Sequence, residues 1–487
     1  MPLILSGNVA SATAGAYEVA NSCRFNDGDS PDMTKTPGAT GDVDKFTISA
    51  WIKLSTINTD YNHIFNAGGA SNDTGAFGFR ITDEQYLGIY LYDGSSYLKK
   101  ETTRVLRDPA AWYHVVCAVD TEQDDNNDRI KLYVNGVLET SFSTTNTITE
   151  DIDTLVNAQV VQQVGCQKNT SGANAYFFDG YMAEVCLIDG SQLAASSFGE
   201  FDDDSPTIWK PIDVSGLTFG TNGFYLDFEA SGNLGNDANG GTDLTETNIV
   251  AADQATDSPT NNFATMNPLD NFIAIATYSE GNLQLASPSS GKYSPHTTTM
   301  WLGAGKWYCE VKETTGAGGG VGQALVGITD RVNTAYGDEL GEHATEWGYY
   351  QVGGFRNNNA TTTYGDSWTA NDIIGIALDI TNSKLYFSKN GTWQDDSSGT
   401  TGDPTSGASG TGAISITAIG STLNDLWTFS SSSWAVAAQN FQWNFGGCPA
   451  FAISSGNADD NGYGNFEYDV PAGYLAVCSK NLGSDGG

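Results

Sequence analysis

The chain has 487 residues, enough for two or three domains with separate apolar cores. Only 16% of the residues are charged, 11% are aromatic and 57 are glycine, a composition typical of many short strands joined by tight turns. The 21 basic and 58 acidic residues give a net charge of −37, which repels phosphate backbones and anionic lipid surfaces. Nucleic acid binding and membrane insertion are therefore not expected.

The cysteines and the first residues indicate where the chain folds. No apolar run reaches the length of about 18 residues that a membrane span needs, and the opening residues lack the basic and apolar parts of a signal peptide. We therefore expect synthesis and folding in a cytosol. The seven cysteines form no CxxC pair, and Cys117, Cys186, Cys309 and Cys478 lie in apolar, strand-like runs. These four are predicted to be buried free thiols rather than metal ligands or disulfide partners.

Apolar and polar residues alternate through much of residues 17–229, as they do in antiparallel strands. Clear examples are KFTISAWIKL at 45–54, WYHVVCAVD at 112–120 and RIKLYVNGVLE at 129–139. The pair Asn135-Gly136 in the third segment is a strong hairpin-turn signal. We expect half-buried strands here, with one face of each strand in a core.

Three clusters of acidic and amide residues resemble calcium loops in their spacing: DGDS at 27–30, DDNND at 124–128 and NADDNG at 457–462. None completes the twelve-residue calcium loop of the EF-hand type. Two interpretations are therefore open: the clusters bind a structural calcium ion, or they form ordinary turns. No other cofactor is expected. The candidate ligands are Asp27, Asp29, Asp124 and Asp128.

Few large apolar residues occur in residues 231–262, which are rich in Gly, Asn, Asp and Thr. Such a segment cannot bury enough surface to fold alone. We predict a polar linker over residues 231–290, between a first domain of residues 1–230 and a second domain of residues 291–487.

The second domain contains the stretch NDIIGIALDITNSKLYFSKNGTW at 371–393. It alternates, turns at Thr381-Asn382-Ser383 and alternates again, which predicts a hairpin. Upstream, aromatic residues between Trp347 and Trp368 are close together in sequence, and alternation assigns about half of them to the core. The other aromatic residues are candidates for a binding site at a rim of the sandwich. Its candidate residues are Arg331, Tyr336, Tyr350 and Arg356.

No pattern in the chain is typical of an enzyme. Glycoside hydrolysis needs two carboxylates about 5 to 9.5 Å apart, and the acidic clusters at 82–85 and 199–206 fall in apparent loops. The histidines, including His63 and His114, form neither HxH nor HExxH. His114, inside a strand, is predicted to be a packed ring with one hydrogen bond. A hydrolase that draws its carboxylates from different segments remains open.

The stretch from Tyr17 to about Phe198 resembles a laminin-G-like, concanavalin-type jelly-roll domain. The resemblance is carried by YEVANSCRFN, FTISAWIKLS, WYHVVCAVD, KLYVNGVLE and FFDGYMAEVCLIDG. In the last of these, Ala183 stands where the family usually has Asp, whereas Glu184 is kept. The resemblance implies a β-sandwich.

Residues from about 291 to 480 are similar to a SPRY domain, through GKWYCEVKE, LVGITD, EWGYY and DIIGIALDITNSKLYFSKNG. The resemblance implies that the hairpin is scaffold and that the loops of one rim meet partners. The expected fold class is thus all-β, with two antiparallel β-sandwich domains in series joined by a polar linker.

Between the two domains, GTNGFYLDFEASGNLG and TDSPTNNFATMNPLDN resemble junction sequences of virion proteins from phages, especially phages of marine bacteria. The resemblance implies a non-enzymatic structural protein on the virion surface, made in the host cytoplasm. Its implied partners are other virion proteins and a host surface glycan or protein. Two alternatives stay open: a tail fibre or receptor-binding protein that recognises host glycans, and a glycan depolymerase. A homo-oligomer, a trimer by analogy with other phage surface proteins, is also expected.

Overall fold

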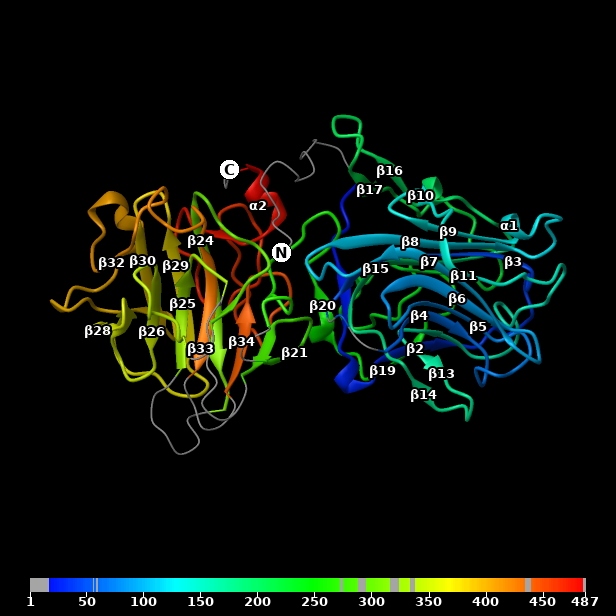
Figure 1. Ribbon diagram of the computed structural model, residues 1–487, viewed down its shortest axis with the longest axis horizontal. Coiled ribbons are helices and arrows are strands. Elements are labelled where there is room, and N and C mark those ends of the chain that lie inside the picture. Colours follow the sequence, from blue (N-terminus) through cyan, green and yellow to red (C-terminus); the bar gives the residue numbers. More distant parts are fainter. Residues whose placement is uncertain are drawn as a thin grey trace. The chain divides into compact units, whose positions relative to one another are not determined.

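The computed structural model describes residues 17–55, 57, 60–271, 275–287, 295–315, 324–332, 338–433 and 439–484. They divide into two compact units, one within residues 10–260 and the other within residues 261–487. Both units are antiparallel β-sandwiches with very little helix (Figure 1), which confirms the predicted fold class. Over the described residues, every helix is too short or too polar to span a bilayer.

One sheet of the first unit has eight strands in the order β10-β9-β8-β3-β15-β1-β20, with β18 pairing with β15. Its strands are β1 (Ser22–Phe25), β3 (Lys45–Leu54), β8 (Trp112–Asp120), β9 (Ile130–Val134), β10 (Val137–Leu138), β15 (Gly180–Asp189), β18 (Phe224–Leu226) and β20 (Gln254–Ala255).

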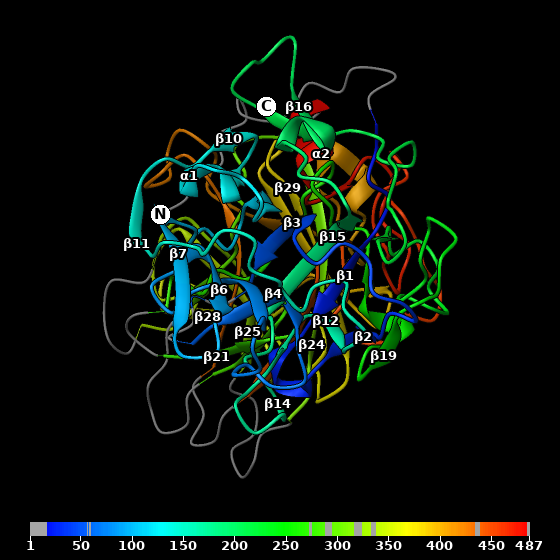
Figure 2. The same ribbon diagram turned by 90° about the vertical axis from the view of Figure 1, so that its right-hand side faces the viewer.

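The other sheet of this unit also has eight strands, in the order β11-β7-β6-β5-β4-β12-β2-β19, and most of them can be followed across Figure 2. They are β2 (Asp32–Lys35), β4 (Asn62–Ala67), β5 (Phe77–Ile81), β6 (Tyr86–Tyr92), β7 (Tyr97–Val105), β11 (Phe142–Thr145), β12 (Gln162–Val164) and β19 (Thr245–Thr247). The unit also has the ladders β13 (Gln167–Lys168) with β14 (Asn174–Ala175) and β16 (Gly199–Phe201) with β17 (Trp209–Pro211), and the short helices η2 (Asp27–Asp29), α1 (Asn126–Arg129), η3 (Ala195–Ser197) and η4 (Ala251–Asp253).

The facing sides of the two sheets enclose the core of the first unit. In β5, Phe77, Phe79 and Ile81 point into this core, whereas Gly78 and Arg80 between them point to the opposite face. Full burial of an apolar side chain of this size contributes about 1.5–3 kcal/mol to folding. The apolar residues that alternate in the sequence are therefore those that face the core in this strand.

The outer face of β3 departs from the expected half-burial. Phe46, Ile48, Ala50 and Ile52 lie in the core as predicted, but Thr47, Ser49 and Trp51 on the other face are buried as well. Thr47 Oγ1 donates to the carbonyl of Ser191, and a second apolar cluster with Phe198 and Phe219 lies on this side of the sheet. Segments far along the chain cover this face, which local periodicity cannot reveal.

The segment predicted as a linker is divided between the two units. Residues 231–260 fold with the first unit, since Leu234, Leu244 and Ile249 join its core, β19 pairs with β2 and β20 pairs with β1. Residues from 261 onward belong to the second unit. A few apolar residues suffice here because they enter a core that other strands have already built.

Ion pairs also fasten this segment to the first unit. Lys53 Nζ lies 2.7 Å from Asp257 Oδ2, and both side chains are at most 2% exposed. Arg24 with Asp253 at 3.0 Å and Lys35 with Asp237 at 3.5 Å add two more pairs. These contacts join positions about two hundred residues apart, so composition alone gives no sign of them.

The second unit is a sandwich of a nine-stranded and a six-stranded sheet. The first contains β21 (Thr277–Ser279), β22 (Gln284–Ala286), β24 (Lys306–Glu313), β29 (Ile373–Asp379), β30 (Lys384–Lys389), β31 (Thr392–Trp393), β32 (Ile414–Ser415), β34 (Asn440–Asn444) and β35 (Leu475–Ala476). The second contains β23 (His296–Thr297), β25 (Ala324–Thr329), β26 (Glu346–Tyr350), β27 (Phe355–Asn357), β28 (Ala360–Thr362) and β33 (Thr428–Ser433). The short helices η5 (Pro404–Ser409) and α2 (Ser479–Ser484) complete it.

The hairpin predicted at 371–393 is present as β29 and β30. Their register runs from Ile374 opposite Lys389 to Asp379 opposite Lys384. Both of its faces are covered. Ala377 and Tyr386 on its outer side pack in one cluster with Tyr308 of β24, Phe466 and other residues near the end of the chain. The hairpin is therefore an interior part of the scaffold.

The four cysteines predicted to be buried free thiols are Cys117, Cys186, Cys309 and Cys478. All four are buried, and none of them forms a disulfide.

Candidate functional site

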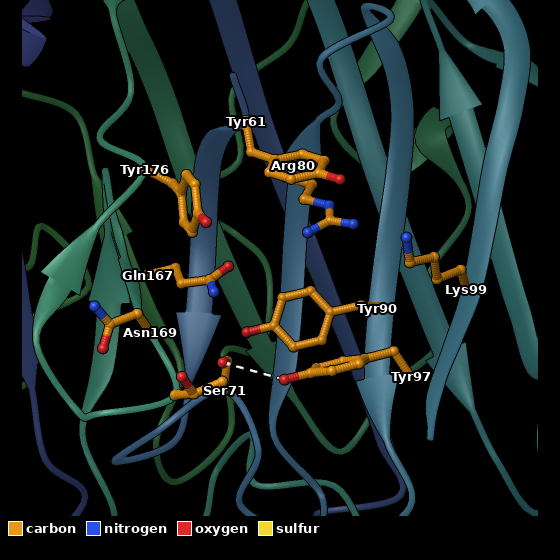
Figure 3. Close-up of a pocket in the computed structure, with 10 residues that line it drawn as sticks. Tyr61, Ser71, Arg80, Tyr90, Tyr97, Lys99, Gln167, Asn169 and Tyr176 are labelled. Carbon is orange, nitrogen blue, oxygen red and sulfur yellow. Dashed lines mark hydrogen bonds between the residues drawn. The ribbon is translucent and has the colours of Figure 1, made fainter. Parts of the chain in front are cut away.

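A hollow of about 270 Å³ lies on the outer face of β5, β6 and β7 in the first unit. Figure 3 shows its lining, with the side chains converging from these strands and from the β13–β14 hairpin. The lining residues are Tyr61, Ser71, Arg80, Tyr90, Tyr97, Lys99, Gln167, Asn169, Thr170 and Tyr176.

Glycines on the outer face of the sheet make room for this hollow. Gly78 pairs with Tyr90 across β5 and β6, and a Cβ at Gly78 would lie 2.2 Å from Cε1 of the Tyr90 ring. Tyr90 can therefore lie flat across the neighbouring strand and form the floor. Asn66 Nδ2 donates to Tyr90 Oη at 2.8 Å and fixes the outer end of the ring.

The guanidinium of Arg80 lies between aromatic rings. Its Cζ is 4.0 Å from the centroid of Tyr61 and 5.2 Å from that of Tyr90, which are cation–π distances. Arg80 Nη2 donates to Glu101 Oε1 at 3.4 Å. Burial raises the pKa of Tyr90 and that of Tyr61, so both rings keep their hydroxyl protons at neutral pH.

Two tyrosines stand on either side of the opening (Figure 3). Tyr97 is 38% exposed and Tyr176 is 37% exposed, so each offers part of its ring to a ligand. The Tyr97 ring packs edge-on to Tyr90 at 5.7 Å between centroids, and Ser71 Oγ lies 3.4 Å from Tyr97 Oη. The mouth is thus aromatic while its surroundings carry hydroxyl and amide groups.

Several polar atoms beneath the hollow have no hydrogen-bond partner among the described residues. They are both ring nitrogens of His63, Nε of Arg80 and Oε1 of Gln167. Burial, followed by the charge of Arg80, lowers the pKa of His63 well below its usual value, against an opposing effect of the nearby Gln167 side chain, so the ring is neutral. Buried polar groups are nearly always hydrogen-bonded, so such a group of unpartnered atoms is a sign of a place for water or a ligand.

A Ser–His pair lies elsewhere in this unit, on the outer face of the other sheet. Ser49 Oγ is 2.9 Å from His114 Nε2, and Trp209 Nε1 donates to His114 Nδ1 at 3.0 Å. Because an indole N–H can only donate, Nδ1 is the acceptor and the proton of the neutral ring sits on Nε2. Burial lowers the pKa of His114 to about 3. This ring therefore donates to Ser49 and cannot accept its proton, and it makes two hydrogen bonds instead of the expected one.

The rim residues predicted in the second unit are engaged by carboxylates. Arg356 Nη1 lies 2.5 Å from Glu339 Oε1, and its Nη2 donates to Asn359 Oδ1 at 2.7 Å. The same glutamate acts on Tyr350: burial first, and then the charge of Glu339, raise the pKa of Tyr350, whereas the charge of Arg356 lowers it.

Arg331 lies beside different acidic groups. Its Nε is 3.4 Å from Asp330 Oδ1 and 3.8 Å from Glu346 Oε1. Tyr336 lies outside the described residues. The structure thus brings Tyr350 and Arg356 together around Glu339 and gives Arg331 other partners, and a rim binding site stays a prediction.

The calcium candidates fall in two short helical turns. Asp27 and Asp29 lie in η2, where Asp29 Oδ2 accepts from the amide of Asn26 at 2.8 Å. Asp124 precedes α1, and Asp128 within it lies 3.0 Å from Lys131 Nζ. Over the described part of the chain, no three His, Cys, Asp or Glu side chains are grouped as metal ligands.

The sequence analysis did not identify the hollow, although its strands carry a signal. In FGFRI at 77–81 and LGIYL at 87–91, the core-facing positions are apolar, and the outward positions read Gly, Arg, Gly and Tyr. A sheet face that combines glycines with Arg80 and Tyr90 is unusual for a solvated surface. The partners from 167 to 176 come from a hairpin about ninety residues away in the sequence, which no local pattern connects to these strands.

Comparisons with known proteins support the two predicted resemblances. Residues 27–195 match the family model described as the concanavalin A-like lectin/glucanases superfamily, and residues 306–402 match that of the SPRY domain. A search of the curated proteins found no match.

Solved structures similar to parts of the chain include three β-sandwich proteins. The SPRY domain of human HERC1 is 13% identical, covering 38% of this chain and 99% of its own, with a TM-score of 0.28. A heptameric SAP-like pentraxin from Limulus polyphemus is 17% identical, covering 37% and 80%, with a TM-score of 0.26. The Ruminococcus gnavus IT-sialidase CBM40 bound to α2,3 sialyllactose is 17% identical, covering 31% and 87%, with a TM-score of 0.23.

Proposed function

We propose that this protein is a non-enzymatic recognition protein that binds a saccharide in the hollow on β5, β6 and β7. The observation that carries this proposal is the pair of part-exposed rings, Tyr97 and Tyr176, on either side of a hollow whose lining also carries amide and hydroxyl groups. Aromatic side chains offer an apolar face with a polar edge, which suits the C–H face and hydroxyl rim of a sugar ring. The match of residues 27–195 to a lectin/glucanase superfamily supports a saccharide as the ligand.

The dimensions and chemistry of the hollow agree with a small polar ligand. Its volume of about 270 Å³ is slightly below the roughly 300–1,000 Å³ of sites for drug-sized molecules. Gln167, Asn169 and Ser71 supply amide and hydroxyl groups that both donate and accept hydrogen bonds. One sugar residue of a longer chain fits this combination better than an apolar peptide side chain does.

The residues that line the hollow support saccharide binding without cleavage. The described lining contains no Asp or Glu, and a hydrolase would need a pair of carboxylates beside the scissile bond. The Ser49–His114 pair has the wrong tautomer for proton abstraction. A depolymerase is therefore the weaker alternative, and release of reducing ends from any bound glycan would establish it.

A glycan array probed with the full chain tests the proposal. Tyr97→Ala and Tyr176→Ala are each expected to weaken binding about tenfold, because each removes one stacking surface. Phe201→Ala is the matched control, since Phe201 is 42% exposed in the same unit but is not part of the hollow. Equal binding by all three variants would show that the hollow is not the site.

The place where such binding occurs is a second part of the proposal. The junction sequences between the units support display on the surface of a phage particle, in contact with other virion proteins and with a host glycan or protein. Immunogold electron microscopy of phage with antibodies against residues 17–260 and 261–487 tests it. Label on the capsid would favour decoration and label on the tail would favour receptor binding, whereas unlabelled particles would remove the virion assignment.

The proposed homo-oligomer is a trimer. Light scattering of the purified chain tests this oligomeric state.

A further inference from the structure

Arg80 is a buried cation with one nitrogen, Nε, that has no hydrogen-bond partner among the described residues. The residue is 5% exposed, and a guanidinium carries several N–H donors that cannot be deprotonated. For the described residues, the hydrogen bond from Nη2 to Glu101 Oε1, at 3.4 Å, is long, and Nε has no partner. Leaving a buried charged donor unsatisfied costs more than leaving a neutral one, so this arrangement favours an acceptor that comes from outside the chain.

The guanidinium is held in one orientation. Tyr61 and Tyr90 lie against it at 4.0 and 5.2 Å from Cζ to the ring centroids, and both rings are themselves packed, Tyr61 against Tyr176 and Tyr90 against Tyr97. A planar group fixed in this way loses little conformational entropy when it binds a ligand. Arg80 is therefore prepared for a planar acceptor.

The two charged residues that line the hollow, Arg80 and Lys99, are both basic, although the chain as a whole carries −37. Acidic groups also lie near, because burial first, and then the carboxylates of Asp83, Glu84 and Glu101, raise the pKa of Tyr61 at the edge of the hollow. Lys99 Nζ, at the opening, lies 3.9 Å from the same Glu101 carboxylate that Arg80 reaches. One carboxylate thus faces two cations, while His63 beneath them is neutral because burial and Arg80 lower its pKa. A neutral ligand would offer no charged acceptor to Nε of Arg80, which is buried and has no partner among the described residues.

We propose that the hollow selects a sugar that carries a carboxylate, such as a uronic or sialic acid, in preference to a neutral sugar. The proposal rests on the glycan-binding function proposed above and specifies its ligand class. The carboxylate accepts hydrogen bonds from the Arg80 guanidinium, with the Lys99 ammonium close by, and the sugar ring lies toward Tyr97 and Tyr176. A carboxylate matches the planar donor edge of a guanidinium, and such charge-assisted hydrogen bonds are about twice as strong as neutral ones.

Calorimetry with matched saccharides tests this selection. The probes are an oligogalacturonide against the same oligomer with its carboxyl groups reduced to alcohols, and sialylated lactose against lactose. We expect at least one acidic member to bind about tenfold or more tightly than its neutral counterpart, with an affinity that falls as salt is added. A sulfated oligomer of the same backbone distinguishes a carboxylate site from a site for any anion.

Variants connect the selection to the hollow. Lys99→Gln, at a part-exposed position that should not affect folding, is expected to reduce the preference for the acidic ligand over the neutral one several-fold. Arg80→Gln should abolish the discrimination. Arg107→Gln is the control, because Arg107 is exposed and does not line the hollow.

The outcomes separate the two proposals. Equal affinity for acidic and neutral members would overturn the acidic-sugar inference and leave saccharide binding standing, as would equal affinity for sulfated and carboxylated oligomers. Acid selection that survives both Lys99→Gln and Arg80→Gln would also overturn it, because the selecting group would lie elsewhere. If no saccharide binds, the proposed function itself fails.

Discussion

At the scale of single residues, Glu184 shows how the fold sets the ionisation of a buried group. The residue lies in β15 with a φ of 51°, where the register against β3 shifts. Its Oε2 accepts hydrogen bonds from Tyr17 at 3.0 Å and Tyr225 at 2.8 Å. Burial raises the pKa of Glu184 to about 7, although the two tyrosine hydroxyls oppose the shift. Folding therefore favours the protonated carboxyl group.

This shift predicts a pH-dependent stability. A carboxyl group with a raised folded pKa adds stability below its unfolded value of about 4.5, and that contribution is lost as pH rises through about 7. Urea unfolding of the wild type and of Glu184→Gln from about pH 4.5 to about pH 8 should show a difference that changes by about 3 kcal/mol, with the wild type losing stability relative to the variant. A difference that stays constant with pH would contradict the prediction.

The Lys53–Asp257 pair predicts a second residue-level effect. Asp257 also accepts a hydrogen bond from Trp112 Nε1 at 3.0 Å, so one side chain serves a buried cation and an indole. Asp257→Asn should lower the free energy of unfolding by about 3–5 kcal/mol, because it leaves the buried Lys53 ammonium without this carboxylate. The double variant Lys53→Met with Asp257→Leu should recover much of the loss. Urea denaturation of the single and double variants checks both statements. A double variant that is no more stable than Asp257→Asn would contradict the expected recovery.

At the scale of elements, the β9–β10 turn combines a local and a distant requirement. Asn135 and Gly136 have φ values of 47° and 77°, as a two-residue hairpin turn with two positive φ angles requires. A Cβ at Gly136 would also lie 2.3 Å from Cε3 of Trp209, which belongs to β17. The turn is therefore specified by its own sequence and by the strand that crosses it.

A pair of glycine substitutions separates these two requirements. Gly190 has a φ of 86° and open space where its Cβ would lie, so Gly190→Ala introduces backbone strain of about 1–2 kcal/mol and little else. Gly136→Ala introduces similar strain and an overlap with Trp209, which should add about 1–3 kcal/mol. Thermal or urea unfolding compares the two variants directly. Equal losses would show that Trp209 moves aside without cost.

Sequence patterns identified elements well and identified contacts between distant elements poorly. The hairpin of β29 and β30 and the Asn135-Gly136 turn follow from signals within about twenty residues. The ion pair of Lys53 with Asp257 and the approach of Tyr176 to Tyr61 depend on segments more than a hundred residues apart. Composition correctly gave an all-β fold, but the polar composition of residues 231–260 concealed its role in the first unit.

At the scale of the whole molecule, each unit has its own pair of sheets and its own buried side chains. The boundary lies between Thr260 and Asn261. A boundary at residue 230 would remove β19, β20 and the carboxylates of Asp237, Asp253 and Asp257 from the first unit. The unit as the structure has it is therefore larger than the lectin-like match alone.

Truncation tests this boundary. A fragment of residues 1–260 should unfold cooperatively in urea. A fragment of residues 1–230 should be aggregated or unfold at much lower urea, because it loses the carboxylates of three ion pairs and the core loses Leu234, Leu244 and Ile249. Circular dichroism during the titration gives the two midpoints. Matching midpoints would show that the segment contributes nothing to the first unit.

The unpartnered polar atoms beneath the hollow bear on how this protein can be changed. His63 and Gln167 carry buried polar atoms without hydrogen-bond partners among the described residues, where apolar side chains of similar size should give a more stable fold, so the protein retains local frustration at one place. Selection for heat resistance alone should therefore accumulate substitutions at these positions, and the variants recovered there should lose ligand binding while they gain stability. Thermostability and recognition are opposed in this small part of the sheet, and a stabilised version for practical use should be sought elsewhere in the chain.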